Sequence, residues 1–247
     1  MNTEWVHIAG VDIEVVQKPI KNLHIGVYPP DGRVRVAAPP SMSADAVRIA
    51  VLTRLPWIER KRLGFLQQAR ETERQYVSGE THWFFGRPLR LHVDEINHGR
   101  HRVYPDGATT LRMRVAETTD WTARNRLVHN WYRRELRDRS QDSVAKWART
   151  LEVPEPRCGI KRMRTKWGSC NPSTGRIWLN LSLAKKPLNA LDYVVLHEVA
   201  HFVSPRHDEA FINVLDRFMP NWRQVRRDLN SSLLDSWTEQ ARSSIIA

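Results

Sequence analysis

Hydrophobic and polar residues alternate in short runs along the first part of the chain. This two-residue period is typical of strands that bury one face. The runs lie at residues 11–15, 23–28 and 33–36. Proline and glycine separate them, so we expect a small antiparallel sheet. Ser41 or Ser43 can then cap a helix, and Pro56 either kinks this helix or begins a second one.

A second series of strand-like runs follows before the pattern becomes helical. Its strands are expected at residues 83–85, 89–93, 102–104 and 111–115. From Thr119 or Asp120 the helical period predicts one long amphipathic helix that ends near Thr150. Its expected buried residues are Leu127, Trp131, Leu136, Val144 and Trp147. We therefore predict an α+β protein with a β-rich N-terminal region at residues 1–117 and a mainly helical region at residues 118–247, with no internal repeat.

The composition is that of an ordinary globular protein with a strongly basic charge. The chain has 247 residues, of which 41% are hydrophobic, enough for a real core. Lys and Arg number 39 against 27 Asp and Glu, and the net charge of +12 indicates an acidic partner. Cys158 and Cys170 are too few for a disulfide framework. Without a signal-peptide pattern or a long apolar run, we expect a cytoplasmic protein with no membrane partner.

A helix-like segment at residues 191–202 carries the strongest chemical signal. It follows Pro187, has no internal breaker and contains the pattern His-Glu-x-x-His at His197, Glu198 and His201. In a helix the two histidines are about 40° apart and roughly 6 Å along the axis, so both imidazoles can reach one tetrahedral zinc ion. Glu198 lies about 100° from His197, which suits a base that contacts water on the metal without binding the metal itself.

A catalytic zinc site needs a third protein ligand and an open position for water or substrate. His207 is the candidate, because Ser204 and Pro205 are expected to end the helix and turn the chain back. Asp208 and Glu209 are the alternatives. The pattern arises by accident in on the order of one chain in fifty, so the third histidine strengthens the metal hypothesis. The predicted residues of this zincin-like site are His197, His201 and His207 for Zn2+ and Glu198 for catalysis.

A short β-hairpin is predicted before this helix, because strand-like runs flank the turn residues 171–175. One edge of such a hairpin can bind an extended peptide as an added strand. Trp167 and Trp178 are equally well explained as side chains packed under the helix. Cys170 is not expected to bind the metal, since three histidines already complete an open site.

Several motifs together resemble a known family. They are Trp167-Gly168-Ser169-Cys170, Asn180, the segment from Asp192 to His201, Pro205-Arg206-His207, Phe211 and Met219-Pro220. This combination resembles the YgjP-like metallopeptidases, which are related to the SprT-like and Wss-type proteases. The similarity is dense from residue 162 to residue 229. It implies the same three histidines as zinc ligands and Glu198 as the acid/base, and Val199 in place of a common leucine is a minor departure.

The expected enzyme is a zinc metallopeptidase that acts on a polypeptide substrate. Glu198 takes a proton from the attacking water and passes it to the leaving amine. Tyr193 and Arg206 are candidates for a second electrophile, although a tyrosine at such a position is more often part of the core and such an arginine is more often solvated. Met219, next to Phe218, is interpreted as ordinary core.

Two other functions remain open. A nucleoside triphosphate pyrophosphatase, an activity assigned within the YgjP branch, would use the same metal with basic residues on the phosphates. The candidates are Arg162, Arg164, Lys166 and Arg206. A nucleic-acid-associated protein or protease would contact phosphates through Arg133, Arg134, Arg137, Arg139, Arg226 and Arg227. Because these arginines are dispersed rather than clustered, a solvated helix face is the simpler explanation for them.

Overall fold

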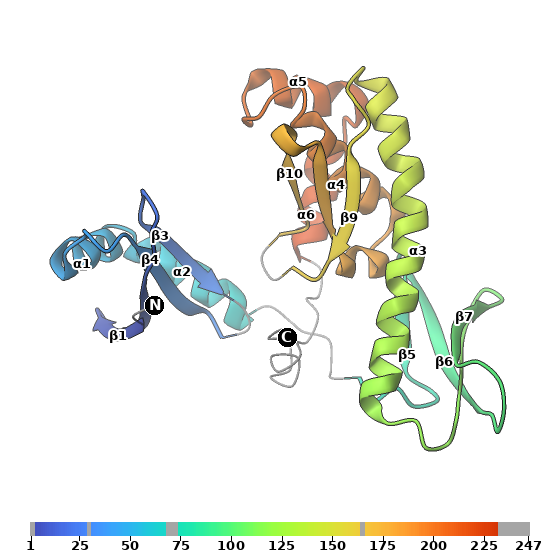
Figure 1. Ribbon diagram of the computed structural model, residues 1–247. Helices are drawn as coiled ribbons and strands as arrows, with labels where there is room; N and C mark the ends of the chain where they lie inside the picture. The colour runs from blue at the N-terminus through green and yellow to red at the C-terminus, as the bar shows by residue number, and fades with distance from the viewer. Residues whose placement is uncertain (1–2, 29–30, 68–73, 164–165, 232–247) are drawn as a thin grey trace. The chain divides into compact units, whose positions relative to one another are not determined.

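The chain forms two compact units. The computed structural model describes residues 3–28, 31–67, 74–163 and 166–231, and contacts divide the chain between Thr72 and Glu73 (Figure 1). The β-rich region at residues 1–117 therefore supplies one sheet to each unit, and a boundary between domains at residues 117 and 118 stays a prediction. Within the described residues, no helix is both long enough and apolar enough to cross a membrane.

The N-terminal unit contains a four-stranded sheet. Its strands are β1 (Thr3–Ile8), β2 (Val11–Gln17), β3 (His24–Tyr28) and β4 (Arg33–Ala38). The strand order is β1-β2-β4-β3, and β2 and β4 run parallel. The expectation of a purely antiparallel sheet is therefore wrong for this pair, because β4 returns from its hairpin with β3 and pairs with β2 in the same direction.

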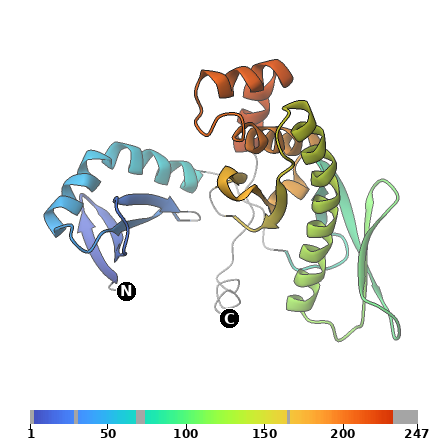
Figure 2. The same ribbon diagram turned by 45° about the horizontal axis from the view of Figure 1, so that its top comes forward.

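Two helices cover this sheet (Figure 2). Helix α1 (Ala44–Thr53) begins at Ser43, whose hydroxyl accepts a hydrogen bond from the backbone N–H of Ala46 at 3.2 Å. This choice between the two candidate serines follows from the N-cap geometry. Helix α2 (Leu55–Gln67) has Pro56 in its first turn, so Pro56 begins a second helix. Val47 and Val51 of α1 pack into the core of the unit.

The second unit begins with a sheet of the same topology. Its strands are β5 (Thr81–Phe84), β6 (Arg87–Glu95), β7 (Arg102–Asp106) and β8 (Thr110–Val115). Their order is β5-β6-β8-β7, with β6 parallel to β8. Both first hairpins also turn through two residues of positive φ, Ala9 and Gly10 in one and Phe85 and Gly86 in the other. The chain thus contains a structural repeat, and the expectation of no internal repeat is wrong.

The long helix α3 (Trp121–Thr150) extends from this second sheet to the C-terminal half of the unit in both views (Figures 1 and 2). Asp120 caps it by accepting a hydrogen bond from the N–H of Ala123 at 2.8 Å. Four of its five expected core residues are buried, namely Trp131, Leu136, Val144 and Trp147. Leu127 is only half-buried, and the neighbouring Val128 occupies the core instead.

The C-terminal half contains a three-stranded sheet and a group of helices. The strands are β9 (Arg157–Lys161), β10 (Gly168–Asn171) and β11 (Arg176–Asn180), and the helices are η1 (Pro172–Thr174), η2 (Leu181–Lys185), α4 (Leu188–Ala200), α5 (Glu209–Phe218) and α6 (Trp222–Ser231). The expected hairpin is present as β10 and β11, and β9 adds a third strand parallel to β11. The α+β class, with a β-rich first half and a helical second half, is confirmed.

Hydrogen bonds attach the second sheet and helix α3 to this C-terminal half. The N–H of Phe85, in the β5–β6 turn, donates to the carbonyl of Ala184 at 2.8 Å. The Asp192 carboxylate of α4 accepts hydrogen bonds from the Ser143 hydroxyl at 2.7 Å and the Trp147 Nε1–H at 2.8 Å, both on α3. These bonds explain why the second sheet belongs to the same compact unit as α4.

A buried histidine lies in the second sheet. His82 is 3% exposed, and burial, with Arg74, Lys185 and His129 nearby, lowers its pKa to about 3. Glu80 Oε2 lies 3.4 Å from His82 Nε2, but this carboxylate already accepts backbone N–H bonds. Burial therefore outweighs the Glu80 carboxylate in setting the pKa of His82, because His82 Nε2 has no hydrogen-bond partner among the described residues. The imidazole is therefore neutral in the folded protein.

Candidate metal centre and active site

Helix α4 carries the first part of the candidate site. It begins directly after Pro187, and its apolar residues pack against α3 and the sheet of β9 to β11. His197 and His201 are half-buried and one turn apart on one side of the helix, with ring centroids 5.2 Å apart and rings perpendicular. The helix ends at Ala200, so His201 occupies the C-cap position.

The turn after α4 brings His207 to the same place. The Nε2 atoms of His207 and His197 are 3.2 Å apart, and the rings of His207 and His201 are 4.9 Å apart. One nitrogen from each of the three histidines lies within 4.8 Å of the other two. Phe211 of α5 packs against all three rings at 4.6 to 4.9 Å. The structure therefore assembles the three histidines that the spacing predicts.

The alternative ligands lie elsewhere. Asp208 is the N-cap of α5, where it accepts hydrogen bonds from the N–H of Phe211 and the hydroxyl of Ser204. These two bonds hold the pKa of Asp208 below its usual value. Glu209 is exposed in the first turn of α5 and is not part of the histidine cluster in the described structure. Asp208 thus stabilises the turn that presents His207.

His197 and His201 have the protonation state of metal ligands. Burial, together with the other two histidines and Arg226, lowers the pKa of His197 to about 3, and burial also lowers the pKa of His201. His201 Nδ1 lies 3.3 Å from the carbonyl of Ser204, which leaves Nε2 free to face the cluster. Imidazole nitrogens that converge in this way can present lone pairs to one point, so a cation fits the cluster.

Glu198 lies beside the cluster and is buried. Its side chain is 5% exposed, and burial raises its pKa to about 7, with Lys166 acting in the opposite direction. The carboxylate packs directly on Gly168 of β10, where a Cβ atom would lie only 2.5 Å from Oε1. The absence of a side chain at residue 168 is therefore what leaves room for Glu198. Sequence reasoning used Gly168 only as part of a family motif and did not find this contact.

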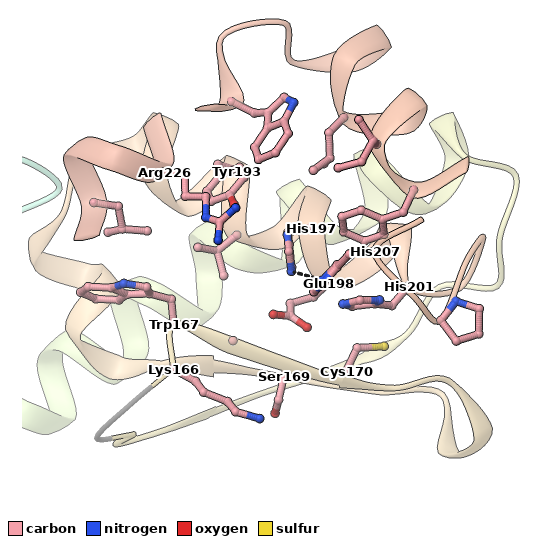
Figure 3. Close-up of a pocket in the computed structure, with 18 of the residues that line it drawn as sticks. Lys166, Trp167, Ser169, Cys170, Tyr193, His197, Glu198, His201, His207 and Arg226 are labelled. Carbon is pink, nitrogen blue, oxygen red and sulfur yellow. Dashed lines mark hydrogen bonds between the residues drawn. The ribbon is translucent and has the colours of Figure 1, made fainter. Parts of the chain in front are cut away.

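A cavity of about 570 Å3 joins these groups (Figure 3). Strand β10 forms one wall, α4 and the His207 turn form a second, and α6 closes a third. Its lining includes four large aromatic residues, namely Trp167, Tyr193, Phe211 and Trp222. Figure 3 shows Glu198 and the three histidines facing the same space. A cavity of this size that combines apolar walls with converging polar groups is typical of a ligand-binding site.

The remaining sequence candidates divide into those in the cavity and those outside it. Tyr193 and Cys170 line it, and burial raises the pKa of the Cys170 thiol to about 12, so it is uncharged. Tyr193 also stacks on Trp222, with ring centroids 6.3 Å apart. Arg206 is exposed and is not among the residues that line the cavity.

Basic and core candidates can be placed in the same way. Lys166 lines the cavity and Arg162 does not, while Arg164 lies outside the described residues. Met219 packs against the main core, as predicted. Arg226 was expected only as a possible phosphate contact, and the structure places it in the cavity wall. Its position beside His197 depends on how α6 packs, which no local pattern reveals.

Comparison with known proteins agrees with the motifs. The family model described as YgjP-like, metallopeptidase domain, matches residues 21–232. None of the curated proteins matches the chain significantly. Among solved structures, the metallopeptidase zymogen of Methanocaldococcus jannaschii jannalysin has 24% identity and a TM-score of 0.36, over 38% of this chain and 90% of that one. The metallopeptidase zymogen of Pyrococcus abyssi abylysin has 15% identity and a TM-score of 0.37, over 40% of this chain and 99% of that one.

The family match covers most of the chain and includes the whole histidine cluster with Glu198. It therefore confirms the resemblance that the motifs carry. The chain belongs to the YgjP-like metallopeptidase family.

Proposed function

We propose that the protein is a zinc metallopeptidase in which His197, His201 and His207 hold the ion and Glu198 is the catalytic acid/base. The observation that carries this proposal is the convergence of three imidazole nitrogens within 4.8 Å beside a buried carboxylate. Three histidines are a donor set that suits zinc and leave a position for substrate.

The spacing of two of the nitrogens fits two ligands of one zinc ion. Zn–N bonds of about 2.0–2.1 Å at a tetrahedral angle separate two ligand nitrogens by about 3.3 Å. The Nε2 atoms of His197 and His207 are 3.2 Å apart. An ion held by His197, His201 and His207 would act as a Lewis acid, polarising the carbonyl under attack and making the attacking water more acidic.

Glu198 is suited to move a proton in both directions. A general acid/base works best when its pKa is near the working pH, and burial raises the pKa of Glu198 to about 7. Its carboxylate accepts a proton from the attacking water and then donates it to the leaving amine. Because Gly168 has no side chain, the carboxylate lies close to β10, and the proton is transferred beside the strand that we assign to substrate binding.

Strand β10 is the proposed peptide-binding edge. In the order β10-β11-β9, it has a paired neighbour only on the β11 side among the described strands. Its other side can therefore pair with an extended polypeptide through backbone hydrogen bonds. Gly168 and Cys170 of this strand line the cavity next to Glu198, so a peptide added there would pass the histidine cluster.

The test compares the zinc-loaded protein with Glu198→Gln on a mixture of unfolded polypeptides and common nucleoside triphosphates. We expect new peptide termini with the unaltered protein and none with Glu198→Gln. Glu209→Gln is the matched control, because this exposed glutamate is close in sequence but outside the cavity. Glu198-dependent release of pyrophosphate instead of peptides would replace peptidase with nucleotide hydrolase, and no Glu198-dependent product at all would refute the proposal.

A further inference from the structure

Helix α6 forms a wall of the cavity that the proposed chemistry does not use. Trp222, Val225 and Leu229 are its buried residues. Arg226 follows Trp222 by four positions and therefore shares its helical face. Figure 3 shows the side chain of Arg226 directed from α6 into the cavity, near Tyr193 and His197. A cation is thus held on a rigid helix close to the reacting groups.

Arg226 differs from the arginines beside it. Arg223 forms an ion pair with Asp216, and Arg227 donates a hydrogen bond to the side chain of Gln224. Arg226 has neither an ion pair nor a hydrogen bond to any other residue that the structure describes. Its guanidinium fork is therefore available to a ligand, whereas its neighbours are engaged on the helix surface.

The charges around the cavity favour an anion. Among the described residues that line it, Glu198 is the only acid and Arg226 the only arginine. Figure 3 places Lys166, the other cation, beside Ser169 rather than in the space that Arg226 faces.

We propose that Arg226 binds a carboxylate of the peptide substrate and thereby directs cleavage to bonds near an acidic residue or near a free C-terminus. This inference rests on the proposed peptidase function and names its substrate class. Arginine binds a carboxylate through two parallel N–H bonds, which fixes orientation as well as position. The surrounding aromatic rings of Trp167, Tyr193 and Trp222 suit the apolar part of the bound chain.

The test uses four versions of one peptide that the enzyme cleaves. Glutamate or glutamine stands next to the scissile bond, and each is made with a C-terminal carboxylate or a C-terminal amide. In one of the two comparisons, glutamate against glutamine or free C-terminus against amide, we expect kcat/KM to be about 10- to 100-fold higher for the peptide that carries the carboxylate. A charge-assisted hydrogen bond implies a difference of this size. The glutamate pair and the terminus pair distinguish a side-chain carboxylate from the chain end.

Variants assign the preference to Arg226. Arg226→Gln should abolish it, Arg226→Lys should restore only part of it, and Arg227→Gln should keep it, because Arg227 does not line the cavity. The affinities of the same four peptides can also be measured by calorimetry without turnover, using the inactive Glu198→Gln protein and the double variant Glu198→Gln/Arg226→Gln. The Glu198→Gln protein should bind the carboxylate-bearing peptide more tightly, and the double variant should lose this preference.

The outcomes separate the two proposals. If the protein cleaves all four peptides equally well, or if Arg226→Gln keeps the preference, the role of Arg226 is refuted and the peptidase function stands. If no peptide is cleaved, the peptidase function fails, and the calorimetric comparison still decides whether Arg226 selects a carboxylate. Equal binding of acidic and neutral peptides in that comparison would overturn the inference.

Discussion

Gly168→Ala is the sharpest test of how Glu198 is positioned. The new Cβ atom would lie 2.5 Å from Oε1, 2.8 Å from Cγ and 2.9 Å from Cδ of Glu198. All three atoms belong to one buried side chain, so the carboxylate rather than the backbone must give way. Gly168 also does not have a positive φ, so alanine is compatible with its backbone.

The geometry sets the size of the effect. Ordinary contact begins near 3.4 Å, so Oε1 must move by about 0.9 Å. A misplacement of about 1 Å in a catalytic group can cost on the order of 100-fold in rate. We therefore expect kcat to fall about 10- to 100-fold, which is about 1.4 to 2.7 kcal/mol in activation free energy. Binding of zinc should change little, because the three atoms nearest to the new Cβ atom all belong to Glu198 and not to a histidine.

The assay measures kcat, KM, bound zinc and the thermal midpoint of the same preparations. Gly64→Ala is the control, since a Cβ atom at this position in α2 meets nothing within 4 Å. A folded, zinc-loaded Gly168→Ala protein with unchanged kcat would refute the argument that Gly168 positions Glu198. If the variant instead loses bound zinc while its kcat per zinc is unchanged, then the histidines, and not the Glu198 carboxylate, have moved to make room for the Cβ atom.

Three further predictions concern the metal, the pH dependence and the fold. His207→Ala should weaken zinc binding on the order of 100-fold in a competition titration with a chelating dye, whereas His98→Ala, an exposed histidine outside the cluster, should not. His82 has a pKa of about 3 when folded and 6.5 when unfolded, so its stabilising effect is complete above pH 6.5 and is lost as the pH falls. Between pH 7.5 and pH 5 urea unfolding should therefore lose about 2 kcal/mol more in the native protein than in His82→Gln, and equal losses would contradict this. Asp192→Ala leaves the buried Trp147 Nε1–H without its acceptor and should lower the free energy of unfolding by about 1–3 kcal/mol, measured by the same method.

The histidine cluster was predictable because its geometry is mostly local. His197 and His201 are placed by the rise and turn of one helix, and His207 needs only the turn that Pro205 favours. The same holds for the caps at Ser43 and Asp120, where one side chain bonds to a backbone N–H three residues away. Signals confined to one turn of chain are therefore recovered from sequence.

Strand pairing was less predictable because it joins distant segments. Alternation shows that residues 33–36 form a strand but does not indicate which neighbour β4 selects. The repeat of the two sheets is hard to predict for a related reason, since Asp31-Gly32 and Asp106-Gly107 each resemble an isolated turn in the sequence. Gly32 and Gly107 have positive φ at equivalent places in the two sheets, which is the part of the signal that sequence comparison within the chain can recover.

The cavity contains both kinds of feature: histidines placed by local geometry, and wall residues placed by the packing of distant segments. Gly168, Tyr193 and Arg226 come from β10, α4 and α6, and only the packing of these elements brings them together. Only a few residue types can bind a zinc ion, so the metal ligands can be recognised from a sequence motif. A residue that selects substrate is constrained only by what enters the cavity, and many side chains satisfy the fold at that position. The reaction class is therefore accessible from the chain, whereas substrate selection has to be argued from groups such as Arg226 once their surroundings are known.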